Sequence, residues 1–133
     1  LRSAIAEAGL DDRVALAGAL ETPALDTLYA AADILASPSL FEGYGMVLAE
    51  AMARGLPLVA STGGAAAETV PDAAGVKVPP GDVAALRAAL RRLITDGAAR
   101  AAFAEGSWAA GQALPRWHDT AARVAGVLKA AAS

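Results

Sequence analysis

Short apolar runs alternate along the chain with longer segments in which apolar residues recur every three or four positions. The short runs predict β-strands, and the longer segments predict amphipathic helices. Regular alternation of the two is typical of parallel strands joined by crossover helices. We therefore expect an α/β fold with a parallel sheet, whose strands are Arg13–Ala17, Asp33–Ser37, Pro57–Ser61 and Gly75–Val78.

Capping residues predict where several helices begin and end. Thr22 followed by Pro23 predicts the N-cap and first residue of a helix between the first two strands. Asp82 predicts the N-cap of a helix that ends near Gly97. Further helices are predicted over residues 1–7, Gly45–Ala53, Ala98–Ala110 and Asp119–Ala131. We expect the aromatic residues of the second half to pack in the core, namely Phe103, Trp108 and Trp117.

Length and composition limit the kinds of protein that fit. The 133 residues suit one domain, and no uninterrupted apolar run approaches the length needed to cross a membrane. Much of the 56% hydrophobic content is alanine, a small helix-forming residue. The net charge of −3, without a stripe of Lys or Arg, makes nucleic-acid binding unexpected. The chain has no Cys and His118 is its only histidine, so we expect no protein-bound metal. The start lacks an initiator Met and a signal peptide, which predicts a fragment.

Ligands of an open parallel sheet bind outside the carboxyl ends of the strands. This directs attention to three loops, Gly18–Thr22, Pro38–Gly45 and Thr62–Glu68. The second loop leads into a helix, whose first backbone N–H groups form a natural phosphate site. Glu42 precedes this helix and Glu50 lies roughly 7–8 Å along its axis, so the two carboxylates suit different parts of one long ligand. They do not form the opposed pair that glycoside hydrolysis requires.

The segment Glu42-Gly43-Tyr44-Gly45, with Glu50 eight residues after Glu42, resembles the E-x7-E signature of GT-B retaining glycosyltransferases, in particular the GT4 family. The segments before and after it resemble the same family in the same order, so the resemblance covers essentially the whole chain. It implies a Rossmann-like domain equivalent to the carboxyl-terminal half of a GT-B enzyme, lacking its first strand. It also implies retaining transfer of a sugar from a nucleotide-diphosphate donor to an acceptor, with no metal usually required.

The resemblance assigns roles to individual residues. Glu42 would be the catalytic-site residue that binds hydroxyls of the donor sugar, and Glu50 would hold the ribose. The backbone N–H groups of the residues after Glu42 would face the diphosphate, namely Gly43, Tyr44, Gly45 and Met46. Ala19 and Leu20 would lie near the base, with Val47 lining the same cleft. As the bond to the diphosphate breaks, amides aimed at the phosphates would stabilise the growing negative charge.

This sequence departs from the family pattern in three respects. Tyr44 stands where Phe is common. The third loop lacks a Pro and is one residue longer before Glu68, which leaves open whether Glu68 contacts ligand or is a surface acid. The phosphate-binding Arg and Lys and the acceptor-binding domain would lie upstream of Leu1, so the fragment is expected to be inactive.

Several alternatives stay open at this point. A GT-B-like sugar epimerase or phosphorylase, or a non-catalytic nucleotide-sugar-binding module, would carry the same features. The donor could be a UDP-, GDP- or ADP-sugar, and its partner would be the protein's own amino-terminal domain. A cytoplasmic location is expected, with peripheral attachment to the inner membrane surface as an option for the whole enzyme.

Overall fold

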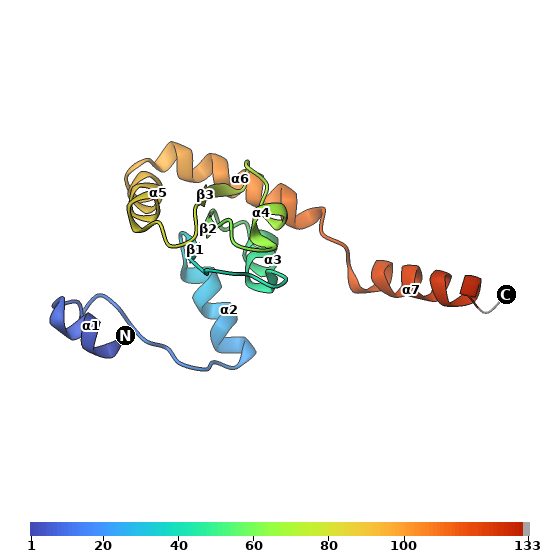
Figure 1. Cartoon of the computed structure of the whole chain (residues 1–133), viewed down its shortest axis with the longest axis horizontal. Helices are drawn as coiled ribbons and strands as arrows, with labels where there is room; N and C mark the ends of the chain where they lie inside the picture. Colours follow the sequence, from blue (N-terminus) through green and yellow to red (C-terminus); the bar gives the residue numbers. More distant parts are fainter. Residues whose placement is uncertain (132–133) are drawn as a thin grey trace. The chain divides into compact units, whose positions relative to one another are not determined.

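The computed structural model describes residues 1–131 and divides the chain into two compact units, the first comprising Leu1–Ala30 and the second beginning at Ala31 (Figure 1). Unit 1 contains helix α1 (Arg2–Glu7), an irregular segment and most of helix α2 (Thr22–Ala31). Ile5 and Tyr29 are its buried hydrophobic residues. Thr22 is the first residue of α2 and not its N-cap, because the carbonyl of Glu21 accepts the first helical hydrogen bonds.

The predicted strand Arg13–Ala17 is wrong. These residues belong to no strand, and Val14 and Leu16 are 40% and 39% exposed. An apolar run becomes a strand only when another strand supplies hydrogen-bonding partners. Local pattern alone could not reveal whether that partner is present.

The three other predicted strands are confirmed, and with them the α/β class. In the second unit β1 (Leu35–Ser37), β2 (Leu58–Ser61) and β3 (Gly75–Val78) form a parallel sheet in the order β1-β2-β3. Leu35 pairs with Leu58, which in turn pairs with Gly75. β1 begins two residues later than predicted, where the N–H of Leu35 donates to the carbonyl of Pro57. Pro57 has no N–H to extend the ladder further.

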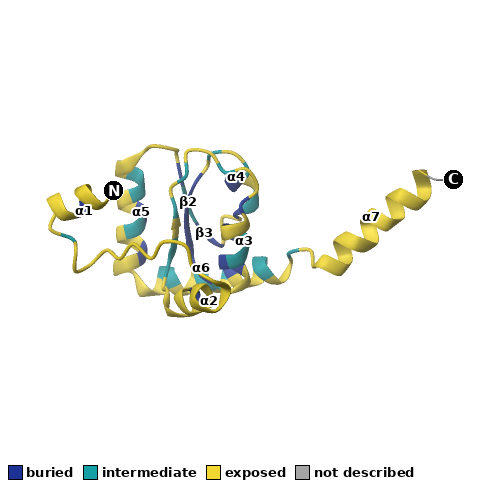
Figure 2. Ribbon diagram, turned by 90° about the horizontal axis from the view of Figure 1, so that it is seen from below, coloured by how far each residue is buried: buried dark blue, intermediate teal, exposed yellow. Residues whose placement is uncertain are grey.

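Helices cover both faces of this sheet (Figure 2). Helices α3 (Met46–Ala53) and α4 (Ala66–Thr69) lie on one face, and α5 (Val83–Thr95) lies on the other. Side chains alternate along β2, so Val59 packs with Val78, Ala89 and Leu93 in the cluster beneath α5. Leu58 and Ala60 are fully buried on the opposite side. The apolar residues of the predicted strands therefore form the core between the sheet and the helices.

Aspartate caps set the boundaries of the next two helices. Asp82 accepts a hydrogen bond from the N–H of Ala85 at 2.9 Å, which confirms it as the N-cap of α5. Asp96 does the same for α6 (Gly97–Gln112) through the N–H of Ala99. Gly97 is therefore the first residue of a new helix, although we predicted it near the end of the preceding one. The separate caps allow α5 and α6 to follow each other without a loop.

Helix α6 crosses the amino ends of the strands. The hydroxyl of Ser107 is fully buried and donates to the carbonyl of Leu56, two residues before β2, at 2.6 Å. Gly106 packs directly against the carbonyl of Ala73, two residues before β3. The candidate loops lie at the opposite edge of the sheet, where the strands end.

The chain ends with α7 (Trp117–Ala131), which has no buried residue among those described. Two of the three aromatic residues predicted for the core are in fact exposed, Trp108 at 53% and Trp117 at 90%. Only Phe103 packs partly against the cluster beneath α5. In residues 1–131, no helix combines the length and the apolar character needed to cross a membrane.

Candidate functional site

Glu42 lies where the loops after β1 and β2 meet at the carboxyl edge of the sheet. Its N–H donates to the carbonyl of Gly63 at 3.0 Å, and its carbonyl accepts from the N–H of Ala65 at 2.8 Å. Glu42 and Gly64 thereby form an isolated parallel bridge outside the main sheet. The hydroxyl of Ser61 also donates to the carbonyl of Ser39. The predicted loops Pro38–Gly45 and Thr62–Glu68 are therefore joined by hydrogen bonds.

The amino end of α3 follows directly. Gly45 precedes the helix in the left-handed region, with φ 85° and ψ 35°, a conformation that favours glycine. The first helical hydrogen bond runs from the N–H of Ala49 to the carbonyl of Gly45, so the amides of residues 46–48 precede the helical ladder. Tyr44 and Met46 are 77% and 62% exposed beside them. Leu48 is fully buried, so the exposed part of this helix tip lies at Met46 and Val47.

The side chain of Glu42 also contacts this tip. One carboxylate oxygen, Oε1, accepts a hydrogen bond from the N–H of Gly45 at 3.1 Å. Of the four amides that the resemblance assigns to a diphosphate, the one at Gly45 therefore already has an acceptor within the protein. The same contact holds the half-buried carboxylate of Glu42 at the start of the helix.

Glu50 lies in α3 and lines a pocket of about 320 Å³ together with Tyr44 and Met46. The structure thus brings three of the predicted site residues to one hollow. The far wall comes from the chain's other end, where Pro115, Trp117 and Thr120 line the same pocket. Sequence reasoning missed this wall because it assigned Trp117 to the core. A signal was available in Pro115, which interrupts the helical pattern just before the tryptophan.

Glu68 lies in the first turn of α4 and is exposed. Behind it, the ammonium of Lys77 forms an ion pair with Asp72 at 2.7 Å and donates to the carbonyl of Ala67 at 3.4 Å. The hydrogen bond from Lys77 and, to a smaller extent, the positive charge of Lys77 hold the pKa of the Asp72 carboxyl below its ordinary value. Lys77 thereby ties β3 to the segment that carries Glu68.

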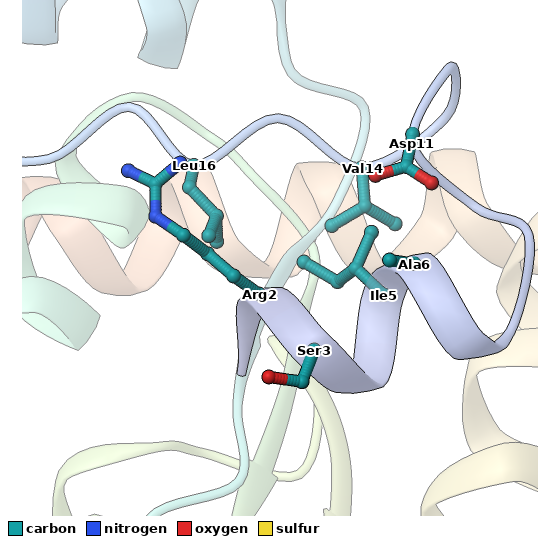
Figure 3. A pocket seen from close by; sticks show the side chains of 7 residues that line it. All are labelled: Arg2, Ser3, Ile5, Ala6, Asp11, Val14 and Leu16. Carbon is teal, nitrogen blue, oxygen red and sulfur yellow. The ribbon is translucent and has the colours of Figure 1, made fainter.

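Ala19 and Leu20 lie in unit 1, in the irregular segment just before α2, and both are exposed. Unit 1 has a pocket of about 490 Å³, but neither residue lines it (Figure 3). Its lining comes from α1 and the segment after it, where Ile5 faces Val14 and the side chain of Arg2 runs beside Leu16. In residues 1–131 there is no group of three or more His, Cys, Asp or Glu residues placed to hold a metal ion.

The fold is a Rossmann-like α/β domain, and its candidate ligand loops lie at the carboxyl edge of a parallel sheet. The chain belongs to the family described as glycosyl transferases group 1, whose sequence model matches residues 1–96. The fold is that of the carboxyl-terminal domain of GT-B glycosyltransferases, as the resemblance implied.

Three similar proteins illustrate the match. The chain is 44% identical over 92 residues to MMP alpha-(1->4)-mannosyltransferase of Mycolicibacterium hassiacum, covering 68% of this chain and 22% of that protein. Sucrose-phosphate synthase from Thermosynechococcus elongatus superposes with a TM-score of 0.89 at 33% identity, over 99% of this chain and 34% of that one. Anabaena HepE in complex with UDP-glucose superposes at 0.87 and 28% identity, over 97% and 35%. The chain therefore spans between a fifth and about a third of these proteins.

Proposed function

We propose that this chain binds the nucleotide-diphosphate sugar donor of a retaining glycosyltransferase. The observation that carries the proposal is the arrangement of Glu42, the partly exposed tip of α3 and Glu50 along one loop-helix segment. The membership in the glycosyl transferases group 1 family supports it, and so does the structural similarity to HepE, which was crystallised with UDP-glucose.

Each part of this segment suits one part of such a donor. The amides at the tip of α3 suit the diphosphate, because they carry the partial positive charge of the helix and precede its hydrogen-bond ladder. Glu42 suits the hydroxyls of the donor sugar, and Glu50, eight residues along, suits those of the ribose. Gly43, Tyr44, Gly45, Met46 and Val47 complete the proposed contacts, with Ala19 and Leu20 assigned to the base.

The chemistry of transfer follows from this placement. When the bond between the anomeric carbon and the diphosphate breaks, negative charge grows on the leaving phosphate. Fixed amide dipoles stabilise that charge more in the transition state than in the ground state, and this difference accelerates the reaction. The groups named here need no metal ion to do so, and metal independence stays a prediction.

Ligand binding tests the proposal directly. Saturation-transfer NMR on the 133-residue chain, with UDP, GDP and ADP and their glucose and mannose conjugates, detects weak complexes and identifies the base. Glu50→Ala should lower the affinity about tenfold to a hundredfold, since charge-assisted hydrogen bonds are lost. Glu105→Ala is the matched control, because this exposed carboxylate lies in α6, at the other edge of the sheet. Absence of binding by the unaltered chain to every nucleotide would refute the proposal.

The reaction of the whole protein needs a second test. We propose hexosyl transfer with retention, which is checked by determining the anomeric configuration of the product made by a longer form that includes the acceptor-binding domain. Inversion would contradict the retaining mechanism. Binding without transfer would indicate a non-catalytic module. The cytoplasmic location, with peripheral membrane attachment of the whole enzyme, stays a prediction.

A further inference from the structure

The residues after β2 hold Glu42 from two sides, although none of them belongs to the proposed set of ligand contacts. Gly63 accepts a hydrogen bond from the N–H of Glu42, and Ala65 donates one to its carbonyl, at 3.0 Å and 2.8 Å. Both polar groups of the Glu42 backbone are thus paired with the same short segment. This pairing fixes the peptide planes on either side of the Cα atom that carries the carboxylate.

Gly63 and Gly64 allow the loop after β2 to come this close to the loop that carries Glu42. A Cβ atom on Gly63 would lie 2.1 Å from the carbonyl oxygen of Leu40, and one on Gly64 would lie 2.3 Å from that of Glu42. Both distances are far below van der Waals contact, so any larger residue would push the two loops apart. Gly64 also has φ +68°, which adds strain for other residues.

Held in this way, the Glu42 side chain reaches the tip of α3. Its Oε1 accepts from the N–H of Gly45 at 3.1 Å, so the carboxylate is fixed by its backbone at one end and by the helix at the other. A shift of the Glu42 backbone would move the carboxylate relative to the amides of residues 46–48. The distance between the sugar-binding and phosphate-binding groups of the proposed site would then change.

We propose that Gly63, Gly64 and Ala65 act as a clamp that positions Glu42 for the donor sugar. The proposal rests on the donor-binding function proposed above. The three are positioning residues, since they act through Glu42 and not through contact with the ligand. Loss of the clamp should therefore weaken recognition of the sugar while leaving recognition of the nucleoside diphosphate largely intact.

Ala65→Pro is the most direct test. Ala65 has φ −63°, which proline can adopt, but the substitution removes the N–H that donates to the Glu42 carbonyl and puts the ring carbon Cδ in its place. Because the nitrogen lies only 2.8 Å from that carbonyl oxygen, the ring pushes the Glu42 carbonyl away and breaks the clamp. Gly63→Ala is the second variant and forces the loops apart through its added methyl group. Gly97→Ala is the control for an added methyl group, because a Cβ there meets nothing within 4 Å and Gly97 lies at the start of α6, outside the proposed site. Gly106→Ala is the control for packing, because its Cβ would lie 2.0 Å from the carbonyl oxygen of Ala73 at the other edge of the sheet.

Two readouts separate positioning from stability. The first is the ratio of the dissociation constant of UDP to that of UDP-glucose, or of the corresponding pair if another base binds. We expect Ala65→Pro, Gly63→Ala and Glu42→Ala each to lower this ratio about tenfold or more, since charged hydrogen bonds to the sugar are lost. The double variant Gly63→Ala with Glu42→Ala should be no worse than Glu42→Ala alone. Gly97→Ala and Gly106→Ala should leave the ratio unchanged.

The second readout needs no ligand. In ¹⁵N-labelled protein the amide resonance of Gly45 should move in both Ala65→Pro and Glu42→Ala, because both change the hydrogen bond to Oε1. An unmoved Gly45 resonance, or an unchanged ratio in folded Ala65→Pro, would overturn the clamp. An equal loss of the ratio in Gly106→Ala would overturn it as well. Failure of the unaltered chain to bind any nucleotide would refute the donor-binding function itself, and the Gly45 resonance would still test the clamp separately.

Discussion

Ser107→Ala should destabilise the domain far more than its small size suggests. The side chain is fully buried, and its hydroxyl lies 2.6 Å from the carbonyl oxygen of Leu56, itself only 7% exposed. Removing the donor leaves a buried carbonyl without this partner, which costs about 1–3 kcal/mol. The bond joins residues 51 positions apart in the chain, so it also fixes α6 to the start of β2.

Urea unfolding followed by circular dichroism measures the effect. The midpoint should fall while the slope with denaturant stays constant, because the surface exposed on unfolding is unchanged. Thr95→Ala is the matched control, since its hydroxyl also donates to a carbonyl, that of Arg91 at 2.9 Å, but on an exposed helix surface. We expect a change there of less than about 0.5 kcal/mol. Equal effects of the two substitutions would show that burial of the acceptor is not what makes the Ser107 bond important.

Further substitutions test the capping, packing and charge of the domain. Asp82→Ala should cost about 1 kcal/mol in thermal unfolding, because it removes the N-cap of α5, and an unchanged midpoint would contradict the cap. Leu93→Ala should cost about 2–5 kcal/mol in urea unfolding, because the side chain is fully buried, whereas Trp117→Ala should be nearly neutral. The lowered pKa of Asp72 means that the folded state favours its charged form. The ion pair with Lys77 therefore stabilises the fold above pH 3.8, the ordinary pKa of the carboxyl, and this contribution disappears as the pH falls through the lower pKa of the folded state. Asp72→Asn should remove that part of the acid dependence, as measured by urea unfolding across acidic pH, and an identical pH profile would refute it.

Local signals in the sequence predicted most of the elements but not their partners. The apolar runs at Pro57–Ser61 and Gly75–Val78 gave strands within a residue of those observed, and Asp82 gave its helix start. These features depend on neighbouring residues, which a sequence shows. The strand prediction for Arg13–Ala17 and the core prediction for Trp117 were wrong because both depend on which other residues pack against these segments. A local sequence pattern does not contain that information.

The candidate site divides in the same way. The spacing of Glu42 and Glu50 predicted their placement before and within one helix, because that relation is local. The hydrogen bonds that join Glu42 with Gly63 and Ala65 connect two loops some twenty residues apart in sequence. In the sequence, Gly63 and Gly64 stand out only as part of a loop that is one residue longer than the family pattern. Its close contact with Leu40 and Glu42 required the fold to be seen.

The crossing of α6 at the amino ends of the strands separates two demands on this domain. Buried bonds such as that of Ser107 maintain the fold at one edge of the sheet, while the loops that carry Glu42 occupy the other. Stabilising substitutions often reduce activity when they stiffen the binding site itself. Here heat resistance can be engineered along α6 and the amino ends of the strands, leaving the loops of the proposed donor site free to be redesigned.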